Sequence, residues 1–459
     1  MVHSCEAIAE SAPESIDPIV LGIGPHLFLD DYLIESSSFV VRRIMSPKRE
    51  SANPLISGEE DGNFQPYISV LRDPETKRFR IWYNIQVDGR RQSHLGYMES
   101  NDGVHWIRPH MELSFPFTVT YGASIIDEGL DYLQSEKRYK YAYYHDGGVR
   151  VAVSSDGLDW DSLSPDILVS SGDFVNIYRD PIRNRYGLNF KSYIEPRDWL
   201  NSNLRTCSQS NSEDLLSWLD SDMHIYPDKR DYGETQFYCM GGVLARGDLL
   251  IGMVKVLRED HPAEPYGEIR GIGYTTLVWS RDGKTWVRDR EPFLNRSSQP
   301  GTWDRAMSWV DTQLPVDDEV YLYYGGYRYG HKGDRNRDRQ IGLARIGRDR
   351  YVARESDTHH EGSGDTARLL TPALIFEGIR MTLNVNADNG KIFVQVMDQD
   401  GEPIPGFTFS DFDPITIDSI EAPVRWARPL ADLEGLPVRL EFQMHQSVQL
   451  FAFNLYDNE

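Results

Sequence analysis

Residues 154–160 read Ser-Ser-Asp-Gly-Leu-Asp-Trp (SSDGLDW), and the pattern Ser-x-Asp-Gly-x-x-Trp returns at 100–106 (SNDGVHW) and 280–286 (SRDGKTW). A degenerate copy at 212–218 (SEDLLSW) lies between the second and third copies. The Asp-Gly pair predicts a tight turn, because glycine adopts a positive φ and aspartate bonds its own backbone; the tryptophan then begins the returning strand. A repeat of roughly 50 to 70 residues has the size of one four-stranded propeller blade. We therefore interpret these aspartates as turn formers.

A second repeat pairs an apolar strand with an aromatic-rich strand across a polar turn. The five pairs are 67–71 with 79–83, 124–126 with 139–143, 175–178 with 186–190, 242–245 with 249–254, and 309–314 with 320–324. Each pair is typical of the inner two strands of a blade, and the Asp-Gly turn joins the outer two. In the fifth unit, which ends at 341–346, that turn is eroded to 347–350. The lack of long segments with a 3.6-residue period also favours an all-β protein.

The predicted fold is all-β: a five-bladed β-propeller followed by a β-sandwich domain. An N-terminal extension, 1–25, precedes a propeller at 26–354, and the strand-like start of this range is interpreted as an added strand that packs on either the propeller or the sandwich. A polar linker at 355–365 leads to the β-sandwich at 366–459, where short alternating strands replace the repeat.

The composition excludes several classes of function. The 459 residues carry a formal net charge of −23, which argues against nucleic acid and anionic membranes as partners, because both bind clustered Lys and Arg. The start of the chain lacks the pattern of a signal peptide, so we expect a cytoplasmic protein, or a periplasmic or secreted one if an export signal has been lost. Cys5, Cys207 and Cys239 are far apart and odd in number, which argues against a disulfide framework and a cysteine zinc site. We expect neither a metal nor an organic cofactor.

A five-unit propeller followed by a β-sandwich resembles the glycoside hydrolases of family 32, the invertase and levanase type. The propeller alone resembles family 43, and the phrases at 26–35 (HLFLDDYLIE) and 398–407 (DQDGEPIPGF) resemble bacterial family 32-like proteins. The resemblance implies a glycosidase of carbohydrate metabolism or polysaccharide degradation, with its site at one end of the central channel. It also implies carboxylates at the starts of the innermost strands. One of them protonates the leaving oxygen, and another attacks or activates water.

Position along the predicted strands selects the candidate catalytic residues. The Arg-Asp-Pro motif of family 32 occurs at 72–74 and 179–181, but a hairpin turn explains both copies, and the family's Asn-Asp-Pro-Asn-Gly and Glu-Cys motifs are absent from the sequence. Glu234 stands before an apolar strand and is the candidate acid. Asp61 is the candidate nucleophile or base, and Asp173 is the candidate partner carboxylate.

Other residues near these positions are candidates for contact with a carbohydrate substrate. They are Gln65, Trp82, Lys191, Asp304, Arg328 and His331. Lys191 is unusual within an apolar strand, although a lysine at a strand end can also reach water. The basic stretch at 324–339 (YGGYRYGHKGDRNRDR) either binds a carboxylate or sulfate group through arginine or forms a charged surface loop. The expected substrate is thus an unusual oligosaccharide that could be anionic.

Three other functions remain open, and the lining of the channel would separate them. They are a non-catalytic carbohydrate-binding propeller, a glycoside phosphorylase of the mannoside type, and a protein-interaction scaffold. A deep acidic pocket would indicate a hydrolase, whereas Arg, Lys and His beside one carboxylate would indicate a phosphorylase. A filled or flat channel would indicate a scaffold. The sequence does not indicate the oligomeric state.

Overall fold

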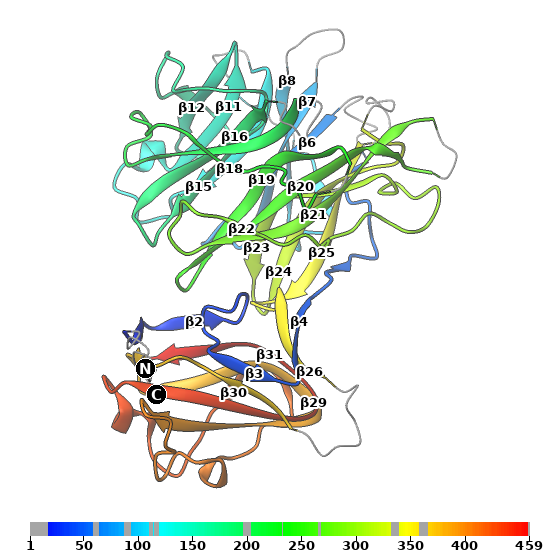
Figure 1. The fold of residues 1–459 in the computed structure, drawn as a ribbon. Helices are drawn as coiled ribbons and strands as arrows, with labels where there is room; N and C mark the ends of the chain where they lie inside the picture. Colours follow the sequence, from blue (N-terminus) through cyan, green and yellow to red (C-terminus); the bar gives the residue numbers. More distant parts are fainter. Residues whose placement is uncertain are drawn as a thin grey trace, which may run out of the picture. The chain divides into compact units, whose positions relative to one another are not determined.

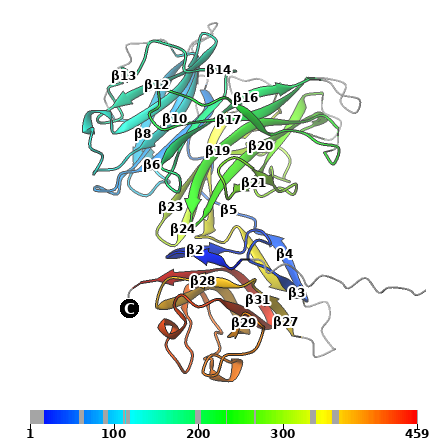
Figure 2. The same ribbon diagram turned by 60° about the vertical axis from the view of Figure 1, so that its left-hand side comes forward.

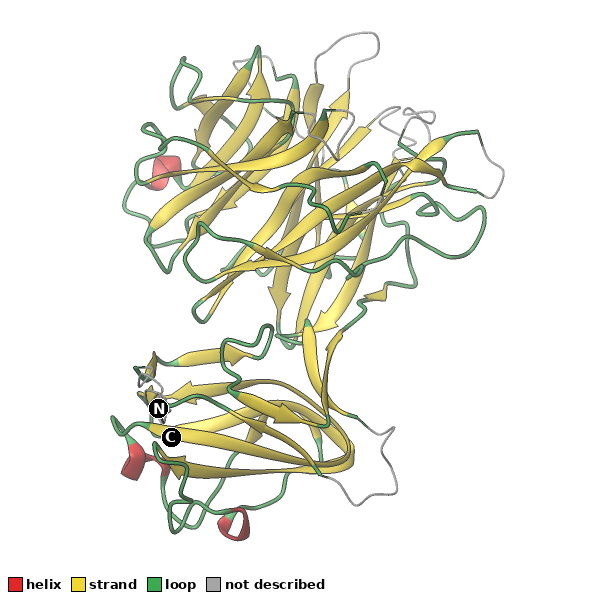
Figure 3. Ribbon diagram, viewed as in Figure 1, coloured by secondary structure: helices red, strands yellow, loops and turns green. Residues whose placement is uncertain are grey.

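The computed structural model describes residues 17–57, 64–86, 93–109, 113, 119–195, 203–231, 233–264, 268–331, 339–357 and 366–457. Strands dominate these residues, with short 3-10 turns such as η1 (Ser135–Lys137), η3 (Phe409–Asp411) and η4 (Leu430–Leu433) (Figure 3). The all-β class predicted from the sequence is confirmed. No helix within the described ranges is long and apolar enough to cross a membrane. The chain divides into two compact units, one formed by 44–351 and the other by 1–43 with 352–459.

The first unit contains five successive groups of antiparallel strands, each called a sheet below, and the fourth and fifth are joined by a parallel pairing of Gly273 with Met307 (Figures 1 and 2). The first sheet holds β6 (Phe64–Arg72), β7 (Phe79–Gln86), β8 (Ser93–Ser100) and β9 (Trp106–Ile107); the second holds β10 (Tyr121–Asp127), β11 (Tyr139–His145), β12 (Gly148–Ser154), β13 (Asp161–Ser162) and β14 (Val169–Ser170). The third holds β15 (Val175–Asp180), β16 (Arg185–Ile194), β17 (Leu204–Ser212) and β18 (Asp222–Ile225); the fourth holds β19 (Thr235–Arg246), β20 (Leu249–Pro262), β21 (Arg270–Ser280) and β22 (Val287–Arg288). The fifth holds β23 (Met307–Val316), β24 (Glu319–Tyr327), β25 (Arg339–Gly347) and β5 (Lys48–Arg49). The five predicted strand pairs all occur as hairpins.

The first strands of the five sheets form a closed ring. β6 contacts β10, β10 contacts β15, β15 contacts β19, β19 contacts β23, and β23 contacts β6. The five strand groups that begin with these strands are thus arranged around one ring. The starts of the first strands therefore converge at one end of the ring.

The fifth sheet obtains its outer strand from an earlier part of the chain. The other sheets continue through an Asp-Gly turn or, in the third, its degenerate Asp-Leu copy, whereas β25 pairs with β5, with Ala344 opposite Arg49. Arg49 donates from Nε to a carboxylate oxygen of Asp304 at 2.8 Å, and this ion pair fastens β5 to the sheet. The eroded turn at 347–350 is thus explained, because no returning strand has to follow it.

The Asp-Gly turns are held by side-chain to backbone hydrogen bonds. Ser280 Oγ accepts the N–H of Gly283 at 2.9 Å, and Asp282 accepts the N–H groups of Lys284 and Thr285 at 2.7 and 2.6 Å. The other copies repeat these bonds. In the degenerate copy, Leu215 takes the glycine position at a φ of 68°. These aspartates are turn formers, as predicted.

Acid should weaken these turns. Burial raises the pKa of Asp282, but the N–H groups of Lys284 and Thr285 outweigh burial and lower the pKa to about 2. A carboxyl whose folded pKa lies below its unfolded value of about 3.9 stabilises the fold above that value, and this stability is lost as the pH falls through the folded pKa. Between about pH 4 and 2, wild type should therefore lose more stability than Asp282→Asn, by at most about 1 kcal/mol because the side chain is exposed. Urea denaturation at several pH values measures this difference, and parallel losses in the two proteins would contradict it.

The second unit is built on two long paired strands, β29 (Arg380–Asp398) and β31 (Val438–Tyr456). The remaining strands are β1 (Ile19–Leu21), β2 (Gly24–Leu27), β3 (Ser36–Ser38), β4 (Val40–Ile44), β26 (Val352–Ser356), β27 (Ala367–Leu370), β28 (Leu374–Phe376) and β30 (Asp418–Pro423). The ranges differ from the predicted domains, because β2 pairs with β31 and β26 also pairs with β31. Of the two places left open for the added strand, the propeller and the sandwich, the pairing of β2 with β31 favours the sandwich. The linker prediction falls mostly outside the described residues.

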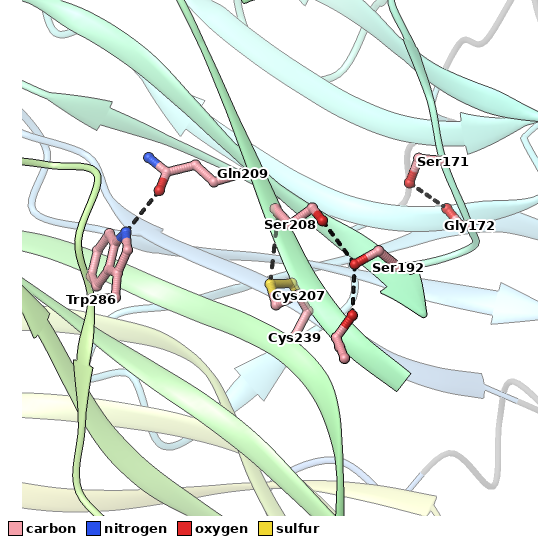
Figure 4. Close-up of a disulfide and its surroundings, with 9 residues drawn as sticks. Ser171, Gly172, Ser192, Cys207, Ser208, Gln209, Cys239 and Trp286 are labelled. Atoms are coloured by element: carbon pink, nitrogen blue, oxygen red, sulfur yellow. Dashed lines mark hydrogen bonds between the residues drawn. A yellow bond between two sulfur atoms is a disulfide. The ribbon is translucent and has the colours of Figure 1, made fainter. Parts of the chain in front are cut away.

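Cys207 of β17 and Cys239 of β19 form a disulfide, with their Cα atoms 4.6 Å apart (Figure 4). Both side chains are fully buried. The sequence argument against disulfides is wrong for this pair, since it relied on the wide spacing of the three cysteines along the chain and on their odd number. In the folded chain the third sheet packs against the fourth, so β17 contacts β19 and the two cysteines lie close in space.

Removing this bond should cost substantial stability. Cys207→Ala is expected to lower the free energy of unfolding by about 2–4 kcal/mol, because the crosslink restricts the unfolded chain. Denaturation with and without reductant checks this, since reductant should destabilise wild type and leave the variant unchanged. A Cys5→Ala protein that keeps the full response to reductant is the matched control. A wild type that ignores reductant under denaturing conditions would contradict the prediction.

Candidate functional site

A cavity opens where the starts of the five first strands converge. Its described lining consists of Tyr67, Tyr121, Asp173, Phe174, Arg205, Tyr238, Lys255, Trp309, Tyr327, His331 and Arg339. The first strand of each sheet contributes one aromatic residue to this lining, either from within its first four positions or from the position just before it. In chain order these are Tyr67, Tyr121, Phe174, Tyr238 and Trp309. The rings lie close together, with centroids 5.8 Å apart for Tyr67 and Phe174 and 4.7 Å apart for Tyr238 and Trp309.

Cationic side chains enter the same cavity from the strands behind. Arg205 comes from β17, Lys255 from β20 and Arg339 from β25. The Arg205 guanidinium carbon lies 4.1 Å from the centroid of the Tyr238 ring. Its buried Nη1 atom has no hydrogen-bond partner among the described residues. Because Arg205 lines the cavity, its guanidinium brings a positive charge to the wall, which suits an anionic group on a bound molecule.

Asp173 carries the single carboxylate among the described residues of the lining. It stands two positions before β15 and forms an ion pair with Lys191 of β16, whose side chain is largely buried. The negative charge of Asp173 also acts on the Tyr67 phenol. Burial chiefly, and then Asp173, raise the pKa of the Tyr67 phenol well above its usual value. The lysine orients this carboxylate at the wall of the cavity.

The buried partner of Lys255 is Asp311 of β23. The two side chains form an ion pair and are only 3% and 5% exposed, and the Lys255 ammonium lies 4.4 Å from the Phe174 ring centroid. Burial lowers the pKa of Lys255 and raises the pKa of Asp311. Each charge therefore depends on the other for its stabilisation.

A chain of hydrogen bonds leads from the cavity into the wall. The Tyr238 hydroxyl lies 2.6 Å from His331 Nε2, and His331 Nδ1 lies 2.8 Å from a carboxylate oxygen of Glu259. Tyr238 and His331 line the cavity, while Glu259 belongs to β20. A phenol, an imidazole and a carboxylate in series can move a proton.

The structure places some predicted site residues at this cavity. Asp173 and His331 line it, and Lys191 contacts Asp173. Asp61 lies outside the described residues, as does the side chain of Gln65, whose backbone belongs to β6.

Other predicted residues lie elsewhere. Trp82 is fully buried and donates from Nε1 to the Gly157 carbonyl at 2.9 Å, so the prediction that it binds substrate is corrected to a core role. Asp304 is buried between Arg49 and Tyr324 and is absent from the lining. Glu234 and Arg328 are exposed and also absent from it.

The sequence argument missed the aromatic lining and Arg205. A usable signal was present, because an aromatic residue recurs near the start of each predicted first strand. Arg205 carries no such signal, since β17 becomes part of the cavity only through packing of the third sheet against the fourth. In the described part of the chain, no three His, Cys, Asp or Glu side chains are grouped to hold a metal ion.

No known protein family matches the sequence, and no curated protein sequence is significantly similar to it. Among solved structures, the chain is similar to a β-1,2-mannobiose phosphorylase from Listeria innocua, with 12% identity, a TM-score of 0.44, and coverage of 65% of this chain and 96% of the other. It is also similar to a family 43 arabinoxylan arabinofuranohydrolase from Bacillus subtilis, with 11% identity, a TM-score of 0.42, and coverage of 90% and 99%. A third similar structure is an N-acetylgalactosamine deacetylase from F. plautii, with 16% identity, a TM-score of 0.42, and coverage of 68% of this chain and 96% of the other. Scores of this size carry no conclusion about activity.

Proposed function

We propose that the chain is a carbohydrate-active enzyme that cleaves a glycosidic bond of an anionic oligosaccharide in the cavity between the first strands. The observation that supports this proposal is the joint lining of one cavity by six Phe, Tyr and Trp side chains, several cations and Asp173. Tyr and Trp present an apolar face and a polar edge, which suits the two faces of a pyranose ring. Arg205 and Arg339 suit a carboxylate or sulfate group on the sugar.

In this proposal Asp173 is the carboxylate that exchanges a proton with the glycosidic oxygen or attacks the sugar. Glycoside cleavage ordinarily uses a second carboxyl group. Asp61 is proposed for that role, since it precedes β6 by three positions and Asp173 precedes β15 by two. Glu234 receives no part, because it is absent from the described lining of the cavity.

Phosphorolysis is the second candidate reaction. Arg205, Lys255, Arg339 and His331 surround the cavity beside a single described carboxylate, which is the pattern expected of an enzyme that uses inorganic phosphate as the attacking group. The same cations would then hold phosphate, and Asp173 would protonate the leaving oxygen.

A product assay on chromogenic glycosides and on neutral, uronate-bearing and sulfated oligosaccharides tests the proposal. Each substrate is incubated with and without inorganic phosphate. Release of free sugar without phosphate supports hydrolysis, and release of a sugar phosphate that requires phosphate supports phosphorolysis. Saccharide binding with no product in either arm would contradict an enzymatic role and favour a carbohydrate-binding protein.

The buried disulfide also bears on where the protein works. Disulfides persist mainly in oxidising compartments, so Cys207–Cys239 favours the periplasmic or secreted alternative over the cytoplasmic expectation. Thiol titration of the protein purified from its natural compartment tests this, because two blocked cysteines are expected there.

A further inference from the structure

We propose that Tyr238 is a catalytic proton-transfer residue of the cavity, and that His331 and Glu259 relay its proton. This inference rests on the proposed function, because it assigns a second proton-transfer group to the same site. It concerns a tyrosine, histidine and glutamate that no sequence pattern had brought together.

The geometry has the order that a relay needs. Tyr238 belongs to β19, is partly exposed to the cavity and presents its hydroxyl 2.6 Å from His331 Nε2. His331 is only 4% exposed, so its ring is held in place, and its Nδ1 lies 2.8 Å from Glu259. The Glu259 side chain is 26% exposed. The phenol thus faces the cavity, while the imidazole and the carboxylate lie behind it.

The proton movements balance without a further reactant. In the resting state the Tyr238 O–H proton has passed to His331 Nε2, so the phenolate accepts from an imidazolium whose Nδ1 donates to the Glu259 carboxylate. When a substrate hydroxyl or water must lose a proton, the phenolate oxygen takes that proton and Tyr238 becomes neutral. His331 remains an imidazolium paired with Glu259. Reversal of these transfers returns a proton to a leaving oxygen.

The surroundings of Tyr238 favour the phenolate. The Arg205 guanidinium carbon lies 4.1 Å from the ring centroid, and Trp309 stacks on the ring at 4.7 Å with an interplanar angle of 24°. The titratable and charged groups that line the same cavity are Tyr67, Tyr121, Asp173, Arg205, Lys255, Tyr327, His331 and Arg339. Lys255 is already paired with Asp311. The charges that stabilise a negative oxygen on Tyr238 are therefore the Arg205 guanidinium and the His331 imidazolium.

A purely structural bond chain would have a different signature. His331 follows β24 of the fifth sheet, whereas Tyr238 and Glu259 belong to the fourth, so the bonds could serve only to join two sheets. In that case their removal would alter stability and leave the ionisation of Tyr238 unchanged. The test therefore measures ionisation directly.

The experiment is a nuclear magnetic resonance titration of the full chain carrying isotope-labelled tyrosine, with the Tyr238 signal assigned by its loss in Tyr238→Phe. Tyr226, which is 46% exposed, serves as the internal reference and is assigned through Tyr226→Phe. We expect the phenolate of Tyr238 to appear at least one pH unit below that of Tyr226. In His331→Gln the Tyr238 transition should move up by about one unit or more. Glu259→Gln should move it in the same direction, and it replaces the histidine variant if that protein does not fold.

A Tyr238 transition at or above that of Tyr226 would overturn the relay, as would a transition unaffected by His331→Gln and Glu259→Gln. The titration uses no substrate, so its failure is distinct from failure of the proposed function. Turnover of a saccharide together with an ordinary Tyr238 would leave the proposed function and remove the relay. Once a substrate is known, Tyr238→Phe should lower kcat by about 10²–10⁴-fold with KM little changed. The plot of kcat against pH should then lack the transition that Tyr238 produces in wild type.

Discussion

Replacing Asp311 by alanine is expected to lower the free energy of unfolding by about 3–5 kcal/mol at neutral pH, because it leaves the Lys255 ammonium buried without its partner. The Lys255 side chain is 3% exposed and the Asp311 side chain 5%, so water cannot replace the lost carboxylate. Denaturant unfolding measures the change. Asp318→Ala, at a side chain that is 78% exposed, should stay within about 0.5 kcal/mol of wild type.

The pH dependence of Asp311→Ala identifies the cause of the loss. Burial lowers the pKa of Lys255 in the folded protein. Between that lowered value and the unfolded value of about 10.4, the unfolded chain binds more protons than the folded one, so stability rises with pH. The deficit of the variant relative to wild type should therefore shrink from neutral pH toward about pH 10. A deficit below about 1 kcal/mol at neutral pH, or one that is constant with pH, would contradict a buried unpaired lysine.

Asp173→Asn is expected to lower kcat/KM by about 10²–10⁴-fold on any saccharide that the wild type cleaves, because it removes the carboxylate that exchanges a proton at the bond. The amide is close in size to the carboxylate, so the wall of the cavity should keep its shape. Initial rates over a range of substrate concentrations separate kcat from KM. Asp166→Asn, at an exposed position before the same sheet, is the matched control and should retain activity.

Glu234→Gln separates this assignment from the one that the sequence alone favoured. Glu234 is exposed and absent from the described lining, so its variant should keep activity within a few-fold of wild type. A large loss in Glu234→Gln with an active Asp173→Asn would contradict the role given to Asp173 and return the acid to Glu234.

The strands and turns could be predicted from the sequence because their signals are local. Ser, Asp and Gly in 280–286 supply each bond of their own turn, and the paired strands beside them are close in sequence. The outer strand of the fifth sheet could not be predicted, because β5 lies almost 300 positions before its partner Ala344. The Cys207–Cys239 bond was missed for the same reason, since it depends on how one sheet packs against the next.

The site was harder to predict than the fold. Asp173 could be chosen because it stands at a strand start, which local patterns reveal. Trp82 was misplaced because an aromatic residue within a strand can face the channel or the neighbouring sheet, and packing against Tyr97 and Tyr139 decides which. Arg205 and Glu259 contribute through strands that are second or third in their sheets. Their part in the site requires the packing of whole sheets.

The most direct test of the central claim is to measure turnover of an oligosaccharide that carries a carboxylate or sulfate group beside its neutral counterpart, with wild type and with Arg205→Ala. Arg205 lines the cavity and lies against the Tyr238 ring, and a charge-assisted bond from its guanidinium to the substrate should favour the anionic saccharide by about 10-fold or more. We predict that wild type cleaves the anionic saccharide preferentially and that Arg205→Ala loses this preference. Turnover of neither saccharide, or a preference that survives in Arg205→Ala, would contradict the claim.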